Sequence, residues 1–425
     1  MTPALRLLGR RRFAPLFVTQ FLGAFNDNLF KTAMVLLVTY YVFSDPTREA
    51  SFNAIAGGLF ILPFFLFSAL AGQLADSSDK ARIIRLVKTA EILIMIVGAA
   101  GLLLQNIPMM LGALFAMGVH SSFFGPIKYA ILPQHLARDE VLGGTGLVEA
   151  GTYAAILGGT MIGGLLAGQP HVAAAAVLGV AIVGRISGHF VPPAPPEPDA
   201  PPLRIDWHIV RSSITLVSAT LHIPRLFLAI MSISFFWAIG ALLAAQFPPL
   251  VKNVFDANEE VATLFLAIFS IGVMVGSVAI NRLLAGNVSA KWAPVSALAM
   301  GAFVLHLYWM VKSWPDSVGA LHGFSSWIAL PGAGWVMVDL FGVAVAGGMF
   351  VVPLYAFLTT TVQKSQTART VAANNIVNSG LMVVSALLLT VLIQLGVSVA
   401  ETLLMVAIGC LGAAWLGWRL HKACD

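Results

Sequence analysis

The stretch that decides the fold runs from Ala54 to Leu104 and reads AIAGGLFILPFFLFSALAGQLADSSDKARIIRLVKTAEILIMIVGAAGLLL. Two apolar segments of 22 residues each, 54–75 and 83–104, flank a short loop with two aspartates and two basic residues. At a rise of 1.5 Å per residue, each segment is long enough to cross the roughly 30 Å hydrocarbon core of a bilayer. Neither segment alternates polar and apolar residues as a barrel strand does, so the pattern predicts two membrane-spanning helices joined at the membrane surface.

The rest of the chain repeats this pattern. Of its 425 residues, 58% are hydrophobic and 10% are charged, against about 25% charged in an ordinary globular domain. This composition excludes a soluble enzyme, a nucleic-acid-binding protein, a coiled coil and a disordered chain. We predict an all-α membrane protein with twelve transmembrane helices, near 15–43, 54–75, 83–104, 107–132, 143–168, 171–191, 225–251, 260–284, 290–312, 331–358, 370–394 and 399–419.

A proline-rich segment divides the twelve predicted spans into two groups of six. Residues 192–202 contain seven prolines, which is typical of an extended, semi-rigid linker. Residues 204–225 mix apolar and charged side chains, as either an interfacial helix or a solvated connector does. We therefore predict three regions, an N-terminal six-helix half at 1–191, a cytoplasmic linker with an interfacial helix at 192–224 and a C-terminal six-helix half at 225–425.

A weak internal repeat indicates symmetry between the two halves, and the distribution of basic residues indicates the orientation in the membrane. Aligning Gly151 with Gly380 places Glu149 on Asn378, which agrees with two pseudo-symmetric halves. Of the 24 lysines and arginines, 20 fall on the side of the N-terminus, three on the other side, and Lys31 inside the first span. The positive-inside rule then places both termini in the cytoplasm. The net charge of +5 is therefore an orientation signal.

The first span carries the deepest charges. Asp27 lies about 12 residues into it, roughly 18 Å from the surface, where a charge costs at least ~2.5 kcal/mol. Lys31 follows at i+4, on the same helix face. The two residues form either a polar patch in a transport cavity or a self-neutralising pair that only packs. Asn28 is a further candidate for the cavity, although Asn26 and Asn28 diverge from this face and favour bonds to neighbouring helices.

Other polar residues occur at depth in later spans. Lys128 and Glu149 lie at similar depth on consecutive helices, and their pairing, as a clamp or as a gate that binds phosphate, is an open alternative. Asn374 and Asn378 either bind substrate or join helices. Asp339 is a candidate cavity acid.

Three more ionisable residues lie in or near the spans. Glu91 has Lys88 close by, which indicates a paired or solvated role. His120 and His306 are typical of hydrogen-bonded packing residues, with a proton relay as the alternative.

Catalytic motifs are missing from the sequence. It contains no Gly-x4-Gly-Lys-Ser/Thr phosphate loop and no HExxH pair, and none of its nine histidines is followed by aspartate five positions later. We expect no enzyme activity, no cofactor and no bound metal.

The polar loop of the opening stretch resembles the signature loop of the major facilitator superfamily. The resemblance rests on Gly72, Asp76, Lys80 and Arg82, with Asp79 where that family usually has glycine. It implies a conformational latch between the two halves, while the plain alternative is an ordinary basic loop at the membrane surface.

Four further segments resemble the bacterial lysophospholipid transporters, a branch of that superfamily. They are Phe21–Asn28, Gly125–Leu132, Gly146–Leu157 and Gly347–Leu354. The form is similar to the membrane half of fused transporter–acyltransferase proteins. One departure is that standalone members carry a basic residue in the seventh span, where Trp237–Ala244 has none.

This resemblance implies a protein of the bacterial inner membrane that moves lysophospholipid, chiefly lysophosphatidylethanolamine, inward by alternating access, and we expect it to be a monomer. Membrane lipids surround it, and a cytoplasmic acyltransferase is the implied partner that re-acylates the product. Two other classes stay open. One is a proton-coupled exporter of amphiphilic drugs that uses Asp27 or Glu149, and the other is a non-transporting scaffold that recruits the acyltransferase through residues 192–225.

Overall fold

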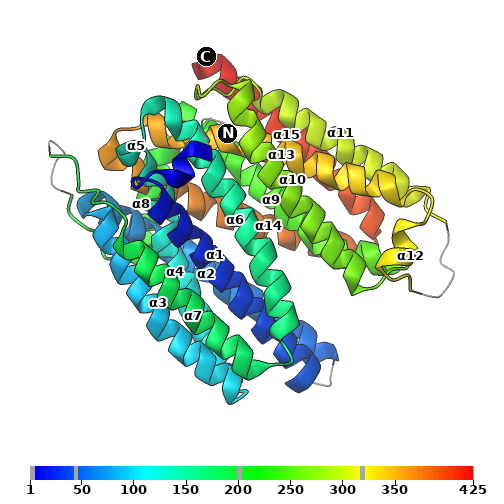
Figure 1. Cartoon of the computed structure of the whole chain (residues 1–425). Helices are drawn as coiled ribbons and strands as arrows, with labels where there is room; N and C mark the ends of the chain where they lie inside the picture. The colour runs from blue at the N-terminus through cyan, green and yellow to red at the C-terminus, as the bar shows by residue number, and fades with distance from the viewer. Residues whose placement is uncertain (1–4, 43–45, 199–202, 316–320, 425) are drawn as a thin grey trace. The chain divides into compact units, whose positions relative to one another are not determined.

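The computed structural model describes residues 5–42, 46–198, 203–315 and 321–424. Within these ranges the chain is helical, and its only β-pairing is one isolated bridge between Ala257 and His322. Twelve of the described helices have 20 residues or more (Figure 1). They are α1 (Ala14–Leu37), α2 (Pro46–Ser77), α3 (Lys80–Leu103), α4 (Ile107–Ala130), α6 (Arg138–Leu166), α7 (Pro170–His189), α9 (Pro224–Asn253), α10 (Glu259–Leu283), α11 (Ala293–Lys312), α13 (Ala333–Thr361), α14 (Thr367–Gln394) and α15 (Val399–Cys424).

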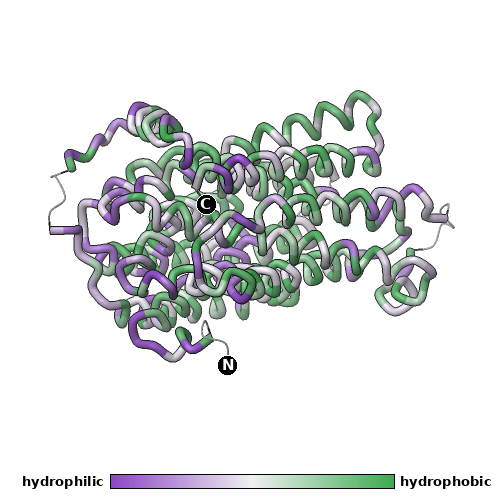
Figure 2. The backbone as a smooth tube through the Cα atoms, turned by 90° about the horizontal axis from the view of Figure 1, so that it is seen from above, coloured by the Kyte–Doolittle hydropathy of each residue, from purple (hydrophilic) through white to green (hydrophobic). Residues whose placement is uncertain are grey.

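The prediction of an all-α protein with twelve long helices is thus confirmed, each helix overlapping one predicted span. Ten of the described helices are long and apolar enough to cross a membrane. The other two, α1 with 24 residues and α6 with 29, are equally long but fall outside this set of ten. Figure 2 shows hydrophobic residues along the long helices and hydrophilic residues in the connecting segments.

Shorter helices fill several connections. A 3-10 helix at Leu5–Gly9 precedes α1, which ends in a π-helical turn at Val38–Val42. A second 3-10 helix, Lys364–Gln366, precedes α14. The remaining short elements are α5 (Leu132–His135), α8 (Ile209–Leu221) and α12 (Phe324–Ile328). Helix α8 shows that the connector at 204–225 contains a helix, and its interfacial position stays a prediction.

The chain divides into two compact units. The first unit comprises Met1–Thr220 and Leu358–Ile376, and the second comprises Leu221–Phe357 and Val377–Asp425. In the first unit α1 packs on α6 and α7, α2 packs on α4, and α3 packs on α4 and α7. In the second unit α9 and α11 both pack on α15. The predicted division at 191 and 225 stays a prediction.

Glycines set the closest helix approaches inside each unit. In the first unit Gly159 and Gly163 of α6 face backbone atoms of α1, at Phe25 and Leu29. In the second unit Gly276 of α10 faces the backbone of α13 at Val345. Small residues spaced four apart let two membrane helices pack backbone to backbone. The spacing in α6 therefore fixes the face that this helix presents to α1.

The proline segment is held on the first unit. The Ala194 N–H donates to Asp79 Oδ1 at 2.8 Å, and the Lys80 N–H donates to the Ala194 carbonyl at 3.0 Å. The Gln134 amide adds a bond to the Pro195 carbonyl at 3.1 Å. Residues 192–198 form no helix, as expected of a proline linker, whereas 199–202 lie outside the described residues.

The packing of α6 on α1 is tested by Gly163→Ala. A Cβ atom at Gly163 would lie 2.7 Å from the Leu29 carbonyl oxygen. We expect a loss of about 1–3 kcal/mol of stability from overpacking, although alanine is the better helix former by about 1 kcal/mol. Apparent melting temperature in detergent measures the effect.

The adjacent substitution Gly164→Ala is the matched control, because its Cβ would meet only the Leu36 side chain at 3.7 Å. It should leave the melting temperature unchanged or slightly raised. Equal melting temperatures for the two variants would contradict the proposed close approach.

Candidate substrate-binding site

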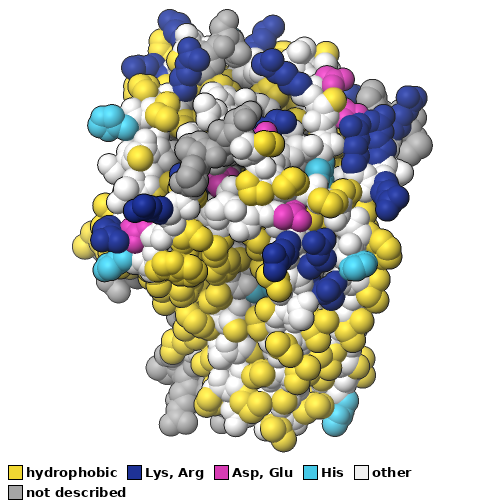
Figure 3. Space-filling model, turned by 90° about the vertical axis from the view of Figure 1, so that its left-hand side faces the viewer, with side chains coloured by type: hydrophobic (Ala, Val, Ile, Leu, Met, Phe, Trp, Pro, Cys, Tyr) yellow, Lys and Arg dark blue, Asp and Glu magenta, His cyan; other side chains and the backbone are white. Residues whose placement is uncertain are grey.

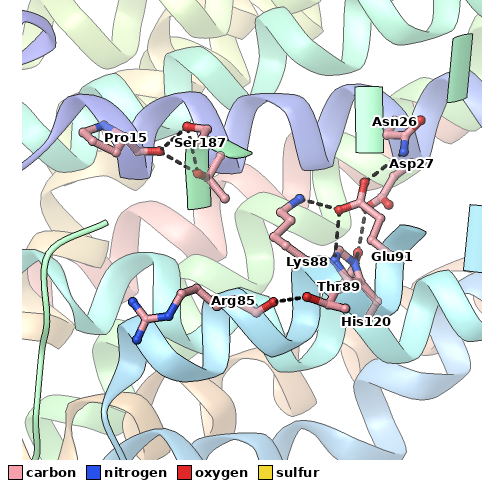
Figure 4. Close-up of polar contacts among 11 residues, drawn as sticks. Pro15, Asn26, Asp27, Arg85, Lys88, Thr89, Glu91, His120 and Ser187 are labelled. Atoms are coloured by element: carbon pink, nitrogen blue, oxygen red, sulfur yellow. Dashed lines mark hydrogen bonds and ion pairs between the residues drawn. The ribbon is translucent and has the colours of Figure 1, made fainter. Parts of the chain in front are cut away.

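A fully buried ion pair lies inside the first unit. Lys88 Nζ is 2.6 Å from Glu91 Oε2, and the two side chains are 0% and 1% exposed. The Asn26 amide of α1 donates to Glu91 Oε1 at 2.9 Å, and His120 Nε2 of α4 lies 3.3 Å from Glu91 Oε2. Figure 4 shows Lys88, Asn26 and His120 converging on the Glu91 carboxylate. The cluster ties α1, α3 and α4 together.

This cluster answers three of the sequence expectations. Glu91 is paired, as expected, but it is buried rather than solvated. Asn26 bonds a neighbouring helix, as its divergence from the Asp27 face predicted. His120 lies within contact distance of Glu91, yet sequence spacing alone did not reveal this partner. The sequence did offer one indication of this cluster. His120, Glu91 and Lys88 all lie within apolar spans, where an unpaired charge is costly and a partner is therefore expected.

Asp27 lies next to this cluster on α1. Its Oδ2 accepts a 2.7 Å hydrogen bond from Ser121, the neighbour of His120 in α4, and its Oδ1 has no hydrogen-bond partner among the described residues. The side chain is buried, with 9% of the residue exposed. A carboxylate oxygen in this position can accept one further bond from an ammonium or a proton donor.

Lys31 makes a different contact from the one its spacing suggested. Its Nζ lies 5.7 Å above the ring of Phe60 in α2, a cation–π geometry. Lys31 lies within electrostatic range of Asp27, but the hydrogen bond that Asp27 accepts comes from Ser121. Asn28 donates to the Ala24 carbonyl of its own helix at 2.8 Å, and within the described part of the chain it shows no hydrogen bond to a neighbouring helix.

A second polar group joins α4 to α6. The Tyr129 hydroxyl donates to Glu149 Oε1, and Glu149 is fully buried. Lys128 Nζ instead lies 3.5 Å from Thr152 Oγ1 and 4.8 Å from the centre of the Tyr129 ring. Lys128 remains within electrostatic range of both Glu149 and Asp27. Tyrosine is thus the direct partner of Glu149, and Lys128 is partly buried beside it.

The remaining candidates are distributed over both units. Asn374 is buried in the part of α14 that belongs to the first unit. Asn378, in the second unit, accepts a 2.6 Å bond from Ser234 of α9, as a helix-joining amide does. Asp339 of α13 is buried and lies 2.8 Å from His306 Nδ1 of α11 through both oxygens. His306 therefore also has a specific partner.

The last turns of α2 make a cap for α14. Asp76 accepts hydrogen bonds from the backbone N–H groups of Ala368 and Arg369 and from Arg369 Nε, all at 3.0 Å. Gly72 allows this approach, because a Cβ there would lie 2.9 Å from Arg369 Cα. An aspartate at a helix N-terminus satisfies unpaired N–H groups and opposes the helix dipole. Lys80 is buried and Arg82 is exposed.

Comparison with known proteins agrees with this architecture. A family model described as Major Facilitator Superfamily matches residues 16–386. The chain belongs to this superfamily. Among superfamily structures, the human organic anion transporter MFSD10 (TETRAN) has a TM-score of 0.75 at 12% identity, covering 98% of this chain and 100% of that one. The transporter FucP, in the outward conformation, has a TM-score of 0.72 at 11% identity, covering 97% and 99%.

Two curated relatives in the superfamily share one name, lysophospholipid transporter LplT. The protein from Escherichia fergusonii is 26% identical over 420 residues, 95% of each chain. The protein from Citrobacter koseri is 28% identical over 390 residues, 89% of this chain and 88% of the relative. This major facilitator protein is therefore a multi-pass membrane transporter.

The buried ion pair is tested by a double-mutant cycle. Lys88→Met leaves Glu91 without its cation, and breaking one side of a buried pair costs about 3–5 kcal/mol. We expect a large drop in the melting temperature of K88M in detergent.

The double variant K88M/E91Q should recover more than half of that loss, because the amide keeps the bond from Asn26 and carries no charge. If the double variant is as unstable as K88M or less stable, the pairing does not carry the stability of this cluster.

Proposed function

We propose that the protein moves lysophospholipid, lysophosphatidylethanolamine in particular, inward across the bacterial inner membrane by alternating access. Its product would be re-acylated by a cytoplasmic acyltransferase. The observation that carries this proposal is a set of ionisable groups at depth in the first unit that form no ion pair with any described residue, namely Asp27, Lys31 and Lys128. The names of the two curated relatives support the same substrate class.

The charges of the site suit a zwitterionic headgroup. Lys88 and Glu91 neutralise each other within 2.6 Å and are closed to solvent. When the site opens, the unbonded oxygen of Asp27 would bind an ammonium, and the amines of Lys31 and Lys128 would bind a phosphate. The seventh span lacks a basic residue in Trp237–Ala244, so the phosphate would bind to the lysines of α1 and α4.

The remainder of the lipid needs only an apolar path. A lysophospholipid has a single acyl chain, which needs an apolar surface to lie against. The protein contains 27 phenylalanines that can supply such a surface. Four of them, Phe13, Phe17, Phe21 and Phe25, follow each other at four-residue spacing along the start of α1, with ring centres 6.0–6.4 Å apart. The row continues toward Leu29 and packs near α6 at Phe25, whereas Asp27 lies on the face of α1 that contacts α4.

The orientation in the membrane and the movement of the two halves complete the proposal. The distribution of 20 basic residues against three places both termini in the cytoplasm, and we propose that the protein acts as a monomer whose two six-helix halves open alternately. The linker at 192–224 joins them. The acyltransferase partner would receive the lipid on the cytoplasmic side.

The substrate is tested in proteoliposomes with labelled lysophosphatidylethanolamine. We expect inward movement by the wild type that persists when the proton gradient is collapsed. Asp27→Asn should slow it roughly tenfold or more, since a charge-assisted hydrogen bond contributes about 1.5–3 kcal/mol and 1.4 kcal/mol is a factor of ten. Asp139→Asn, at an exposed position on α6, is the matched control and should transport at the wild-type rate.

Three results would count against the proposal. Wild-type transport by D27N would make Asp27 a structural residue. Drug efflux that requires a proton gradient, without lipid movement, would favour the exporter alternative. Absence of any transport, with intact binding of an acyltransferase, would favour the scaffold alternative.

We also propose that the cap of Asp76 on α14 acts as a conformational latch. The capped residues belong to the first unit, and the same helix continues from Val377 into the second. Breaking and remaking three hydrogen bonds at this point would therefore accompany a change in how α14 is held.

The latch is tested by removing the acceptor oxygens of Asp76 in two steps. Asp76→Asn keeps a single acceptor oxygen and Asp76→Ala keeps none, so we expect the initial rate of lipid movement to fall several-fold in D76N and further in D76A. Surface expression and melting temperature serve as controls for folding. An ordinary basic loop predicts the wild-type rate in both variants.

A further inference from the structure

A basic cavity lies apart from the candidate substrate site, at the ends of α3 and α7. It has a volume of about 670 Å³ and is lined by Arg11, Arg12, Arg85 and His189, together with the apolar residues Phe190, Val191, Pro192 and Pro193. All of these residues belong to the first unit. The lining includes four basic side chains and no acidic one.

The local acids leave part of this positive charge uncompensated. Glu140 is bound by Arg12, at 2.6 and 2.7 Å, and by Arg10. Asp79 Oδ2 lies 3.9 Å from Arg85, while its Oδ1 accepts from the backbone of Ala81 and Ala194. Arg11 is exposed and forms no ion pair with any described residue. Arg11 and Arg85 are therefore the two guanidinium groups available to a ligand.

Hydrogen bonds hold the walls of the cavity in place. The proline segment is anchored by the backbone pairing of Ala194 with Asp79 and Lys80. The Pro193 carbonyl accepts from His135 Nε2 at 3.3 Å, and Val191 is 2% exposed. The guanidinium of Arg12 is held by a bidentate bond to Glu140. Such a preformed frame loses little entropy when an anion binds.

The surroundings of the cavity are those of a lipid rather than of a free ion. Phe190, in its wall, is 59% exposed, and Leu86 and Ile186, on the adjoining turns of α3 and α7, are 63% and 55% exposed. In a helix that spans a membrane, such side chains face acyl chains. Figure 3 shows the same pattern on the face it draws, with groups of Lys and Arg side chains bordering a broad hydrophobic surface.

We infer that this cavity binds the headgroup of an anionic membrane phospholipid such as phosphatidylglycerol, as a bound lipid distinct from the transported substrate. Guanidinium groups pair with phosphate oxygens through two parallel hydrogen bonds, and basic pockets at the cytoplasmic ends of membrane helices are suited to anionic headgroups. A zwitterionic lipid is disfavoured, because its ammonium would meet no carboxylate in the lining.

The inference is tested by lipid binding, without any transport measurement. The full chain in detergent is titrated with phosphatidylglycerol, and bound lipid is counted by native mass spectrometry. We expect the double variant R11Q/R85Q to raise the apparent Kd at least tenfold. The variant R6Q/R138Q removes the same charge from exposed arginines that do not line the cavity, and it should change the Kd less than twofold.

Two further titrations identify the ligand. Phosphatidylethanolamine should bind the wild type at least tenfold more weakly than phosphatidylglycerol, and inorganic phosphate at the same concentration should not displace the lipid. Equal binding by the two double variants, or equal binding of the two lipids, would overturn the proposal. Displacement by inorganic phosphate would assign the cavity to a free anion instead and would also overturn it.

A salt titration of the wild type tests the same inference without relying on the folding of any variant. Binding of phosphatidylglycerol to the wild type should weaken steadily with added salt, because the interaction is between exposed charges. A salt-independent affinity would contradict an electrostatic headgroup site even if R11Q/R85Q failed to fold.

Discussion

The structure of the first unit depends on one constraint, which is that a charge surrounded by apolar helices must find a partner within the protein. Lys88 and Glu91 satisfy it together at 2.6 Å, with Asn26 and His120 completing the carboxylate's contacts. Because the partners come from α1, α3 and α4, the ion pair also fixes how these three helices are rotated. The rotation of α1 in turn decides that Asp27 meets Ser121 and keeps one oxygen unbonded.

Glycine supplies the second constraint on the same helices. At Gly159 and Gly163 the backbone of α6 comes against that of α1, so α6 cannot rotate without losing this contact. The fixed rotation places Glu149 inward, where the Tyr129 hydroxyl binds it. Lys128 then lies beside Thr152 and outside the hydrogen bond between Tyr129 and Glu149. Packing therefore leaves Asp27, Lys31 and Lys128 outside the buried ion pair of Lys88 and Glu91.

Polar groups at the ends of the helices serve different purposes. Asp76 binds the start of α14, a helix that belongs partly to each unit, and Asp79 holds the proline segment that walls the basic cavity. The end of α2 and the start of α3 thus reach both a helix that the proposed transport cycle would move and a surface where lipid would bind. The proposed headgroup site and the proposed substrate site use separate residues, since one is rich in arginine and lacks acids whereas the other balances lysine with aspartate.

The sequence by itself determined the number and length of the long helices, the superfamily and the presence of Asp27, Lys31, Lys128 and Glu149 at depth. Hydropathy over some 20 residues depends only on local composition, and a charge inside such a segment is visible without a structure. Only the tertiary structure decided which charges pair. Spacing suggested Lys31 for Asp27 and Lys128 for Glu149, whereas the hydrogen bonds come from Ser121 and Tyr129. The reason is that a partner on another helix depends on the rotation of both helices, which side-chain packing across the whole unit sets.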